Sequence, residues 1–449
     1  MPESLARPKT KEDVLRLAEA QEIRFILLQF TDILGVMKNV AIPVEQLPKA
    51  LDGQILFDGS SVHGFVRIEE SDMLLSPDPE TYVALPWHNT DRGNTARLIC
   101  DIQTPEGGAF GGCPRTALKR VIAEAAQLGY VMNAGPEAEF FMFHLDADGR
   151  PTVKTHDKGG YFDLSPVDLG EQARRDMVIT LQDIGFEVEA SHHEVAEGQH
   201  ELDFRYADAL TAADSIITLK LVVRTVAMQH GLHATFIPKP IFGIAGSGMH
   251  VHQSLFKKDR NMFHDPKAEH GLSDVCLKYM GGLLHHARGF TAITNPLVNS
   301  YKRLVPGYEA PVYIAWSERN RSPLIRIPAR RGIGTRVELR SPDPSCNPYL
   351  AMAVMLKAGL DGIKKGIQPP PPVNRNIYQM DAAERRQLGI ASLPGSLEEA
   401  LAELLADQVI QEALGEHILS QFVNAKRIES DVYRTQVHQW ELDQYLWVF

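Results

Sequence analysis

Two histidines and a set of separate glutamates most constrain what this chain can fold into. The run 246–252 reads GSGMHVH, and its glycines suit a tight turn that leads into a strand. Side chains alternate along a strand, so His250 and His252 would point to the same face. The glutamates that occur in apolar or strand-like surroundings are Glu137, Glu139, Glu194, Glu201 and Glu338.

Carboxylates combined with an imidazole are the ligands of a hard divalent cation such as Mg²⁺ or Mn²⁺, which itself binds polyphosphates. A pair of histidines alone is more often structural or solvated than metal-binding. Glu137 and Glu139 change that balance, because they would share one face of a strand that continues into the apolar run 140–143. A carboxylate pair beside a core is unfavourable unless a cation neutralises it. The sequence therefore predicts a metal site, although these residues alone do not specify a reaction.

The composition is that of an ordinary globular protein with two or three domains. The 449 residues are 44% hydrophobic and 23% charged, and the net charge of −11 argues against a nucleic-acid-binding protein, which needs a basic surface. Residues 1–14 lack the apolar segment of a secretory signal, and no apolar run is long enough to span a bilayer. The cysteines lack the close spacing of a zinc or redox motif, so we expect reduced thiols in a cytoplasmic protein that binds no membrane. The four cysteines are Cys100, Cys113, Cys276 and Cys346.

The first part of the chain predicts a small α+β domain. Thr10 is placed to cap a first helix, and strands are predicted at 23–30 and 36–42. The loop 58–61, which reads DGSS, is more often a surface turn than a binding site when judged from local sequence alone. The glycine- and proline-rich segment 105–114 predicts a domain boundary, which we place between residues 112 and 113.

The second part alternates helices with strands, as a sheet covered by helices requires. Each of its first three predicted helices ends at a glycine, which is the usual C-terminal signal. The predicted elements are helices at 115–128, 168–184, 209–230 and 349–365 and strands at 137–144 and 248–252, with a further strand that residues 186–189 lead into. The aromatic tail 434–449 is predicted to pack against another surface.

Arginines are concentrated between residues 299 and 348, where glycine, proline and serine separate them. Guanidinium groups in loops suit the binding of carboxylates and phosphates, although scattered surface ion pairs explain such a pattern about as often. The chain contains neither a P-loop nor a complete dinucleotide-binding glycine motif, so any nucleotide is held in another way.

Seven ordered motifs resemble type I glutamine synthetase, and the resemblance extends from about Ile23 to the C-terminus. The motifs are FDGSS (57–61), GPEAEFF (135–141), HHEVA (192–196), GSGMH (246–250), KRLVPGYEAP (302–311), NRS (320–322) and RVELRSPDP (336–344). The resemblance implies an α+β chain with an N-terminal β-grasp domain (1–112) and a catalytic domain (113–449) built on a curved antiparallel sheet with flanking helices. It also implies a dodecamer of two stacked hexameric rings.

The resemblance implies ATP-dependent ligation of ammonia to L-glutamate, which yields L-glutamine, ADP and phosphate through γ-glutamyl phosphate in nitrogen assimilation. Carried over by position, Glu139, Glu194 and Glu201 hold one Mg²⁺ or Mn²⁺ ion, and Glu137, His250 and Glu338 hold a second. The residues implied at the nucleotide site are Glu189, Tyr206, His252, Ser254 and Arg336.

The same resemblance assigns the other substrates. The residues implied at the glutamate and the transferred phosphate are Gly246, Arg303, Arg321 and Arg340, and Arg321 is also counted as catalytic. Asp58 of a neighbouring subunit would bind ammonium and help to remove its proton, while Glu309 on a flexible loop would close the site. Arg67 resembles a residue of the subtype that glutamine inhibits by feedback. Tyr378 aligns roughly with a tyrosine that is adenylylated in the other subtype, but its surroundings resemble the unmodified subtype more.

One departure from the family pattern and three alternatives bear on function. Ala245 stands where the family usually has an asparagine that helps to bind glutamate. A ligase for a larger amine, such as a polyamine, tends to lose the DGSS ammonium site, which this chain keeps. A non-catalytic scaffold or nitrogen sensor predicts lost metal ligands or a lost Glu309, and neither is lost. An active enzyme that also binds a nitrogen-responsive transcriptional regulator fits the feedback subtype, and the sequence does not test that role.

Overall fold

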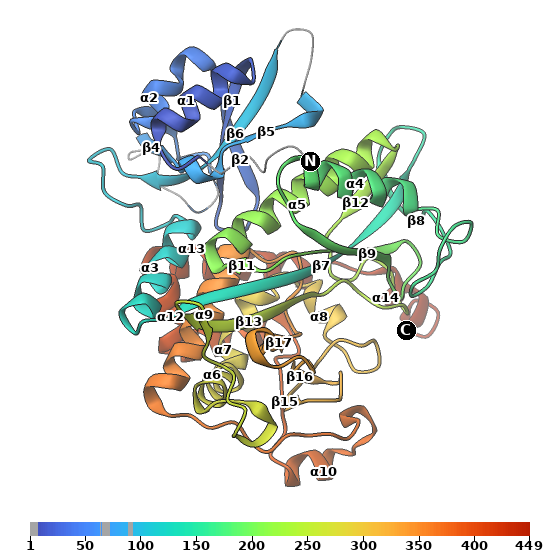
Figure 1. Cartoon of the computed structure of the whole chain (residues 1–449). Helices are drawn as coiled ribbons and strands as arrows, with labels where there is room; N and C mark the ends of the chain where they lie inside the picture. The colour runs from blue at the N-terminus through green and yellow to red at the C-terminus, as the bar shows by residue number, and fades with distance from the viewer. Residues whose placement is uncertain (1–7, 63, 65–71, 89–92) are drawn as a thin grey trace.

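The computed structural model describes residues 8–62, 64, 72–88 and 93–449, which form two sheets (Figure 1). The N-terminal sheet has the order β2-β1-β6-β4-β3, with β5 paired to β6. Its strands are β1 (Ile23–Thr31), β2 (Met37–Pro43), β3 (Ile55–Asp58), β4 (Asp72–Pro77), β5 (Val83–Ala84) and β6 (Asn94–Gln103). The pair β1–β6 is parallel, and the other pairs are antiparallel.

Helix α1 (Lys11–Ala20) covers this sheet. Thr10 caps the helix as predicted, and its hydroxyl and the side chain of Asp13 form a capping box. Val14 and Ala18 recur at helical spacing and pack on Ile26 and other sheet residues in a core of their own. The short helix α2 (Leu47–Leu51) packs beside α1.

The larger sheet has the order β18-β15-β16-β17-β13-β7-β10-β9. Strands β8, β11 and β12 pair with β7, and β14 pairs with β13. The strands are β7 (Val131–Leu145), β8 (Pro151–Thr155), β9 (Val188–His193), β10 (Gln199–Phe204), β11 (Ala207–Asp208), β12 (Leu232–Thr235), β13 (Met249–Lys257), β14 (Arg260–Asn261), β15 (Tyr313–Ser317), β16 (Pro323–Arg326), β17 (Val337–Leu339) and β18 (Ala391–Ser392). Its pairs are antiparallel as expected, except that β15 and β16 run parallel and make the sheet mixed.

Strand β7 begins six residues before the predicted strand at 137–144 and runs through Pro136. A proline is usually excluded from a central strand, because it has no N–H to donate. On one side of β7, Pro136 lies opposite Val251 of β13. On the other side, β11 pairs at Ala134 and β10 pairs no further than Ala138, so Pro136 falls between two partner strands. The ladder thus tolerates the proline, and β7 can span the sheet.

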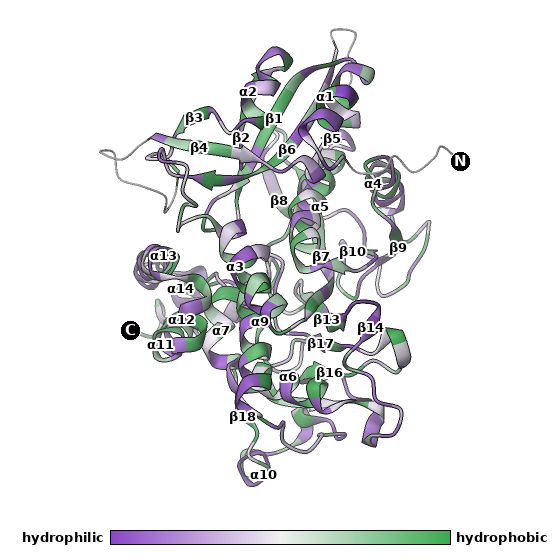
Figure 2. Cartoon of the chain, turned by 60° about the vertical axis from the view of Figure 1, so that its left-hand side comes forward, coloured by the Kyte–Doolittle hydropathy of each residue, from purple (hydrophilic) through white to green (hydrophobic). Residues whose placement is uncertain are grey.

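Helices enclose the larger sheet and form most of the core. Helix α9 (Pro348–Lys365) is buried along most of its length and packs on α3 and α6. Figure 2, coloured by hydropathy, shows α9 among neighbouring helices beside β13 and β17. The other helices are α3 (Pro114–Gln127), α4 (Glu171–Asp183), α5 (Ala209–Gln229), α6 (Asp274–His285), α7 (Ala287–Thr294), α8 (Ser300–Arg303), α10 (Ala382–Gln387), α11 (Leu397–Ala406), α12 (Gln408–Leu414), α13 (Glu416–Arg434) and α14 (Gln439–Tyr445).

Buried polar contacts join the two parts of the chain. Arg115 of α3 is 3% exposed and donates to Asp78 (2.6 Å) and Asp101 (3.1 Å) of the N-terminal part and to Asp214 of α5 (2.9 Å). A cation among three carboxylates compensates for its own desolvation, and loss of the cation would leave buried charges unpaired. These contacts fix the N-terminal sheet on the helices of the larger sheet.

The C-terminal tail is helical but lies at the surface of this chain. Trp440, Trp447 and Phe449 are 62%, 92% and 99% exposed, so the predicted packing does not occur within the subunit. All four cysteines are free and buried. None of the helices in the described part of the chain has the length and apolar character needed to cross a membrane.

Candidate functional site

Strand register brings the predicted metal ligands together on the larger sheet. His250 of β13 lies opposite Glu137 of β7, and Glu201 of β10 lies opposite Glu139 of β7. Residues in such cross-strand pairs are direct neighbours on one face of a sheet. Residues far apart in the sequence therefore form two acidic groups along β7.

The first group, which we call the His250 cluster, consists of Glu137, His250 and Glu338. Their ligand atoms lie within 4.8 Å of one another. Burial and the charge of Arg340 lower the pKa of His250 to about 4, so its imidazole is neutral and keeps a lone pair for a cation. Burial alone would raise the pKa of Glu338, but Arg340 lowers it below its usual range. Arg326 Nε also donates to Glu338, at 2.5 Å, and holds this carboxylate in place.

His252 lies next to this cluster in a fixed tautomer. Arg336 Nε donates to His252 Nδ1 at 3.0 Å, so Nδ1 is an acceptor and the proton lies on Nε2. His252 Nε2–H then donates to Glu137 Oε1 at 2.7 Å. Burial opposes ionisation of Glu137, but the neighbouring imidazoles of His250, at 3.7 Å, and of His252 bring its pKa well below the usual range. Glu137 is therefore a carboxylate that can bind a cation.

The second group, which we call the Glu201 cluster, consists of Glu139, Glu194, Glu201 and His192. Ligand atoms of His192, Glu194 and Glu201 lie within 4.8 Å of one another. Burial and the charge of Glu139 raise the pKa of Glu201 well above its usual range, and burial and Glu194 raise that of Glu139. These shifts arise because several carboxylates lie close together with little access to water. A divalent cation bound among them would relieve their mutual repulsion. The oxygen and imidazole donors of both clusters are those that Mg²⁺ and Mn²⁺ accept.

A small cavity of about 40 Å³ joins the Glu201 cluster to two arginines. Arg303 is buried, and its guanidinium donates to the carbonyls of Ser341 (2.7 Å) and Arg340 (3.2 Å), which orient it. Arg340 Nε is buried and has no hydrogen-bond partner among the described residues. The residues that line the cavity are Glu139, Glu194, Val195, Gln199, Ala245, Gly246, His250, Arg303, Tyr308, Glu309, Ala310 and Arg340. Guanidinium groups on one side of a cavity can bind the carboxylate or phosphate of a substrate, and the glutamates on the other side can bind metal ions next to it.

Family models match nearly the whole chain. A model described as "Glutamine synthetase, catalytic domain" matches residues 111–445, and one described as "Glutamine synthetase, beta-Grasp domain" matches residues 22–105. The chain belongs to the glutamine synthetase family. It is 61% identical to a glutamine synthetase of Thermus thermophilus over 440 residues, which cover 97% of this chain and 99% of the relative. It is 58% identical to one of Staphylococcus aureus over 441 residues, with 98% and 99% covered.

Solved structures of similar proteins share the fold of this glutamine synthetase family member. A structure titled "GmaS/ADP complex" superposes with a TM-score of 0.87 at 34% identity and covers 96% of this chain and 99% of its own. Glutamine synthetase from Plasmodium falciparum superposes with a TM-score of 0.86 at 26% identity, with 97% and 98% covered.

Of the residues that the glutamine synthetase resemblance assigns to the nucleotide, Glu189 lies on β9, Tyr206 follows β10, His252 and Ser254 lie on β13, and Arg336 directly precedes β17. Ser254 is buried and follows His252 by two residues in β13, so both side chains lie on one face of the strand. Tyr206 follows β10 and is 47% exposed, and Glu189 is exposed on β9. Two of the residues assigned to the nucleotide, His252 and Arg336, contact each other directly through a hydrogen bond.

Several predicted residues lie apart from the cavity within one chain. Asp58 ends β3 in the N-terminal sheet, and both views of the chain separate that sheet from β13 (Figures 1 and 2). Its carboxylate accepts hydrogen bonds from Ser60, from N–H at 2.8 Å and from Oγ at 2.6 Å. Arg321 is exposed, and Arg67 lies outside the described residues. Glu309 lines the cavity.

Residues that sequence reasoning did not assign also belong to the site. Gln199 donates to Glu139 Oε2 at 2.9 Å, and its spacing of two from Glu201 gave a usable signal, because both side chains lie on one face of β10. His192 joins the Glu201 cluster, and the ring of Tyr161 packs on it at 5.7 Å. Tyr161 also interacts with Arg321 through its hydroxyl. No local pattern in the sequence predicts the position of Tyr161.

A third group of possible metal ligands, Asp157, His193 and His200, lies on the opposite face of β9 and β10. Arg174 Nη1 lies 3.0 Å from His200 Nδ1 and has only protons to offer, so Nδ1 accepts and Nε2 carries the proton. His200 Nε2 then has no lone pair for a metal. His193 Nε2 lies 2.9 Å from Asp157 Oδ1. We interpret this group as a buried polar network that supports the two strands.

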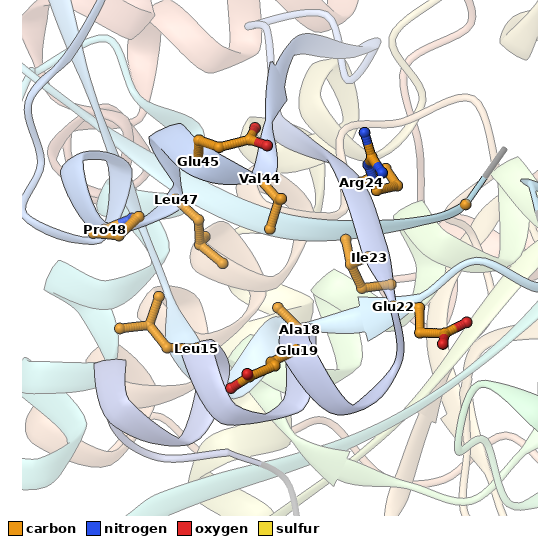
Figure 3. Close-up of a pocket in the computed structure, with 11 residues that line it drawn as sticks. Leu15, Ala18, Glu19, Glu22, Ile23, Arg24, Val44, Glu45, Leu47 and Pro48 are labelled. Atoms are coloured by element: carbon orange, nitrogen blue, oxygen red, sulfur yellow. The ribbon is translucent and has the colours of Figure 1, made fainter.

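A wide cavity of about 750 Å³ lies in the N-terminal part and away from both clusters. Apolar side chains of Leu15, Ala18, Val44 and Leu47 face one another across it (Figure 3). The cavity lies beside α1, and nothing in the structure shows what would cover it. We therefore assign the chemistry to the smaller cavity, where charged and metal-binding groups converge.

Proposed function

We propose that this chain catalyses the ATP-dependent ligation of ammonia to L-glutamate and thereby assimilates nitrogen. ATP first phosphorylates the γ-carboxylate, and ammonia then displaces phosphate from γ-glutamyl phosphate to give L-glutamine. The observation that carries this proposal is the convergence of two acidic clusters with Arg303 and Arg340 around one cavity. Family membership supports the same reaction.

The arginines handle the anionic substrates in this mechanism. Arg303, held by main-chain carbonyls, and Arg340, whose Nε finds no partner in the described part of the chain, would bind glutamate carboxylate or the transferred phosphoryl group. Arg321 would join them from the exposed side. Position 246 requires a glycine, because a Cβ there would clash with the carbonyl oxygen of Pro238 and would also crowd the side chain of Arg303.

The clusters would hold two divalent cations, Mg²⁺ or Mn²⁺. The His250 cluster would hold one and the Glu201 cluster the other. Bound cations supply positive charge that offsets repulsion between ATP phosphates and the γ-carboxylate. His252, locked by Arg336 and Glu137, would bind the nucleotide together with Tyr206, Ser254 and Glu189.

Ammonium would be bound by Asp58 of a neighbouring subunit and by Glu309. Hydrogen bonds from Ser60 lower the pKa of Asp58, so its carboxylate is ionised at neutral pH and can attract the cation. Glu309 would then close the cavity before ammonia attacks.

The test is phosphate release from ATP in the presence of glutamate and Mg²⁺, with and without ammonium, together with direct measurement of glutamine. We expect release to depend on ammonium and to match glutamine formation. Release that ignores ammonium and responds to a polyamine would instead identify a ligase for a larger amine. Absence of release with any amine would favour a scaffold or sensor.

Ala245 gives a prediction about substrate affinity. It lines the cavity where the family usually has an asparagine. Ala245→Asn should lower the KM for glutamate about 3- to 10-fold, because one hydrogen bond to the substrate is gained. The KM for ATP serves as the internal control and should stay the same. An unchanged or higher KM for glutamate would contradict a substrate contact at this position.

Assembly and regulation extend the proposal. The exposed aromatic tail, with Trp447 and Phe449, supports subunit association, which we propose is a dodecamer of two hexameric rings in the cytoplasm. We also propose glutamine feedback through Arg67 and keep binding of a nitrogen-responsive transcriptional regulator as part of the proposal. The division between residues 112 and 113 falls between β6 and α3 and remains our proposed domain boundary.

A further inference from the structure

The loop that carries Glu309 has a backbone conformation that its own sequence does not favour. Glu309 has a φ of 62°, in the left-handed region that few residues other than glycine adopt. Gly307 has a φ of 95°, which a glycine accepts without strain. A non-glycine residue stays in this region only when its surroundings hold it there, so contacts outside the loop must contribute.

Both neighbours of Glu309 make such contacts. On the C-terminal side, the Tyr378 hydroxyl donates to the carbonyl of Ala310 at 2.7 Å. On the N-terminal side, the ring of Tyr308 lies 4.1 Å from Lys239 Nζ, which is cation–π geometry. Lys239 Nζ also donates to the carbonyl of Ile244, and this hydrogen bond holds the charged end of the Lys239 side chain against the ring of Tyr308.

Tyr378 is itself held firmly. It lies in a 3₁₀ turn (Ile377–Gln379) whose first residue, Ile377, is buried and donates its N–H to Ser322 Oγ at 3.3 Å. Its ring packs on Tyr313, with centroids 6.0 Å apart. Burial raises the pKa of Tyr378 to about 12, so the hydroxyl keeps its proton and remains a donor at neutral pH.

We propose that Tyr378 and Lys239 are positioning residues that clamp the Glu309 loop over the cavity and so direct γ-glutamyl phosphate to ammonia rather than to water. This inference rests on the proposed function. In the productive step, the bond from the acyl carbon to the phosphate oxygen breaks, a carbon–nitrogen bond forms, and ammonia loses one proton. In the wasteful step, water replaces ammonia, glutamate is regenerated, and one ATP is hydrolysed without product.

The deciding quantity is the ratio of glutamine formed to phosphate released. Tyr378→Phe removes the bond to Ala310 and keeps the ring on Tyr313. We expect phosphate release without ammonium to rise about 5-fold, as loss of one hydrogen bond to the closed loop implies, and the ratio with ammonium to fall. Tyr313→Phe removes a hydroxyl from the same ring pair but leaves the Ala310 bond in place, so it should keep the wild-type ratio.

A second pair of variants tests the other side of the loop. Tyr308→Leu should also uncouple phosphate release from glutamine formation, and Tyr308→Phe, which keeps an aromatic face for Lys239, should restore coupling. Wild-type coupling in both Tyr378→Phe and Tyr308→Leu would overturn the inference. A fall in all rates at an unchanged ratio would also overturn it, because that result indicates a purely structural role. Failure of the proposed function is distinct, since the wild-type protein would then show no ammonium-dependent release.

Discussion

Replacing Glu139 with glutamine is expected to lower kcat/KM for glutamine formation about 10²–10³-fold at saturating Mg²⁺. Glu139 is 7% exposed and lies opposite Glu201 in the register of β7 and β10. The substitution keeps an oxygen that can accept from Gln199 and from the Gly248 N–H, so the local hydrogen bonds survive. What is lost is one negative charge of the Glu201 cluster, and a neutral amide is a much weaker ligand for a hard cation.

Two measurements separate this effect from a general loss of structure. Titration with Mn²⁺ should show two tight sites per subunit in the wild-type protein and one in Glu139→Gln. The matched control is Glu197→Gln, which removes an exposed carboxylate that pairs only with Lys158, at 3.1 Å, among the described residues. That variant should keep wild-type activity and metal content. Full activity of Glu139→Gln would show that the reaction does not need a metal ion bound by the Glu201 cluster.

Secondary structure could be predicted from the sequence where residues close together in the chain determine it. The capping box at Thr10 follows from residues within one helical turn, and α5 was predicted at 209–230 and observed at Ala209–Gln229. The extent of β7 could not be predicted, because Pro136 is tolerated only through the positions of β10 and β11, which come later in the sequence.

The candidate site was only partly predictable for a similar reason. Alternation along a strand places Glu137 and Glu139 on one face, but it does not say which cluster each joins. Cross-strand register decides this, because Glu137 meets His250 and Glu139 meets Glu201. The division into two ligand sets therefore came from the family resemblance and not from the residues alone.

The loop arginines show how packing divides residues that look alike in sequence. Arg303 and Arg340 line the cavity. Arg331, from the same region, donates to Glu318 at 2.7 Å and to the carbonyl of His270 at 2.8 Å, which ties loops together away from the cavity. Composition predicts that guanidinium groups gather here, and only the fold tells which ones face a substrate.

Asp58→Ala is expected to lower ammonium-dependent glutamine formation about 10²–10³-fold, because the carboxylate that we propose to bind the cation and to accept its proton is lost. Every residue that lines the cavity lies between Glu139 and Arg340, whereas Asp58 belongs to the exposed end of β3 in the N-terminal sheet. The site would therefore be completed only when another subunit presents its Asp58. This arrangement makes a prediction that no single-chain site would share.

Co-expression of Asp58→Ala and Glu139→Gln subunits should restore activity that neither variant has alone. A shared site is intact when the Asp58→Ala chain supplies Glu139 and its Glu139→Gln neighbour supplies Asp58. In a symmetric ring with random mixing of the two chains, about a quarter of the sites meet this condition. Activity near that fraction of wild type is expected, measured as glutamine formed per subunit. Co-expression of Asp58→Ala with the double variant is the control and should stay inactive, because neither chain carries Asp58. If the mixed Asp58→Ala and Glu139→Gln oligomer also stays inactive while retaining the wild-type assembly size, Asp58 does not act across the subunit interface.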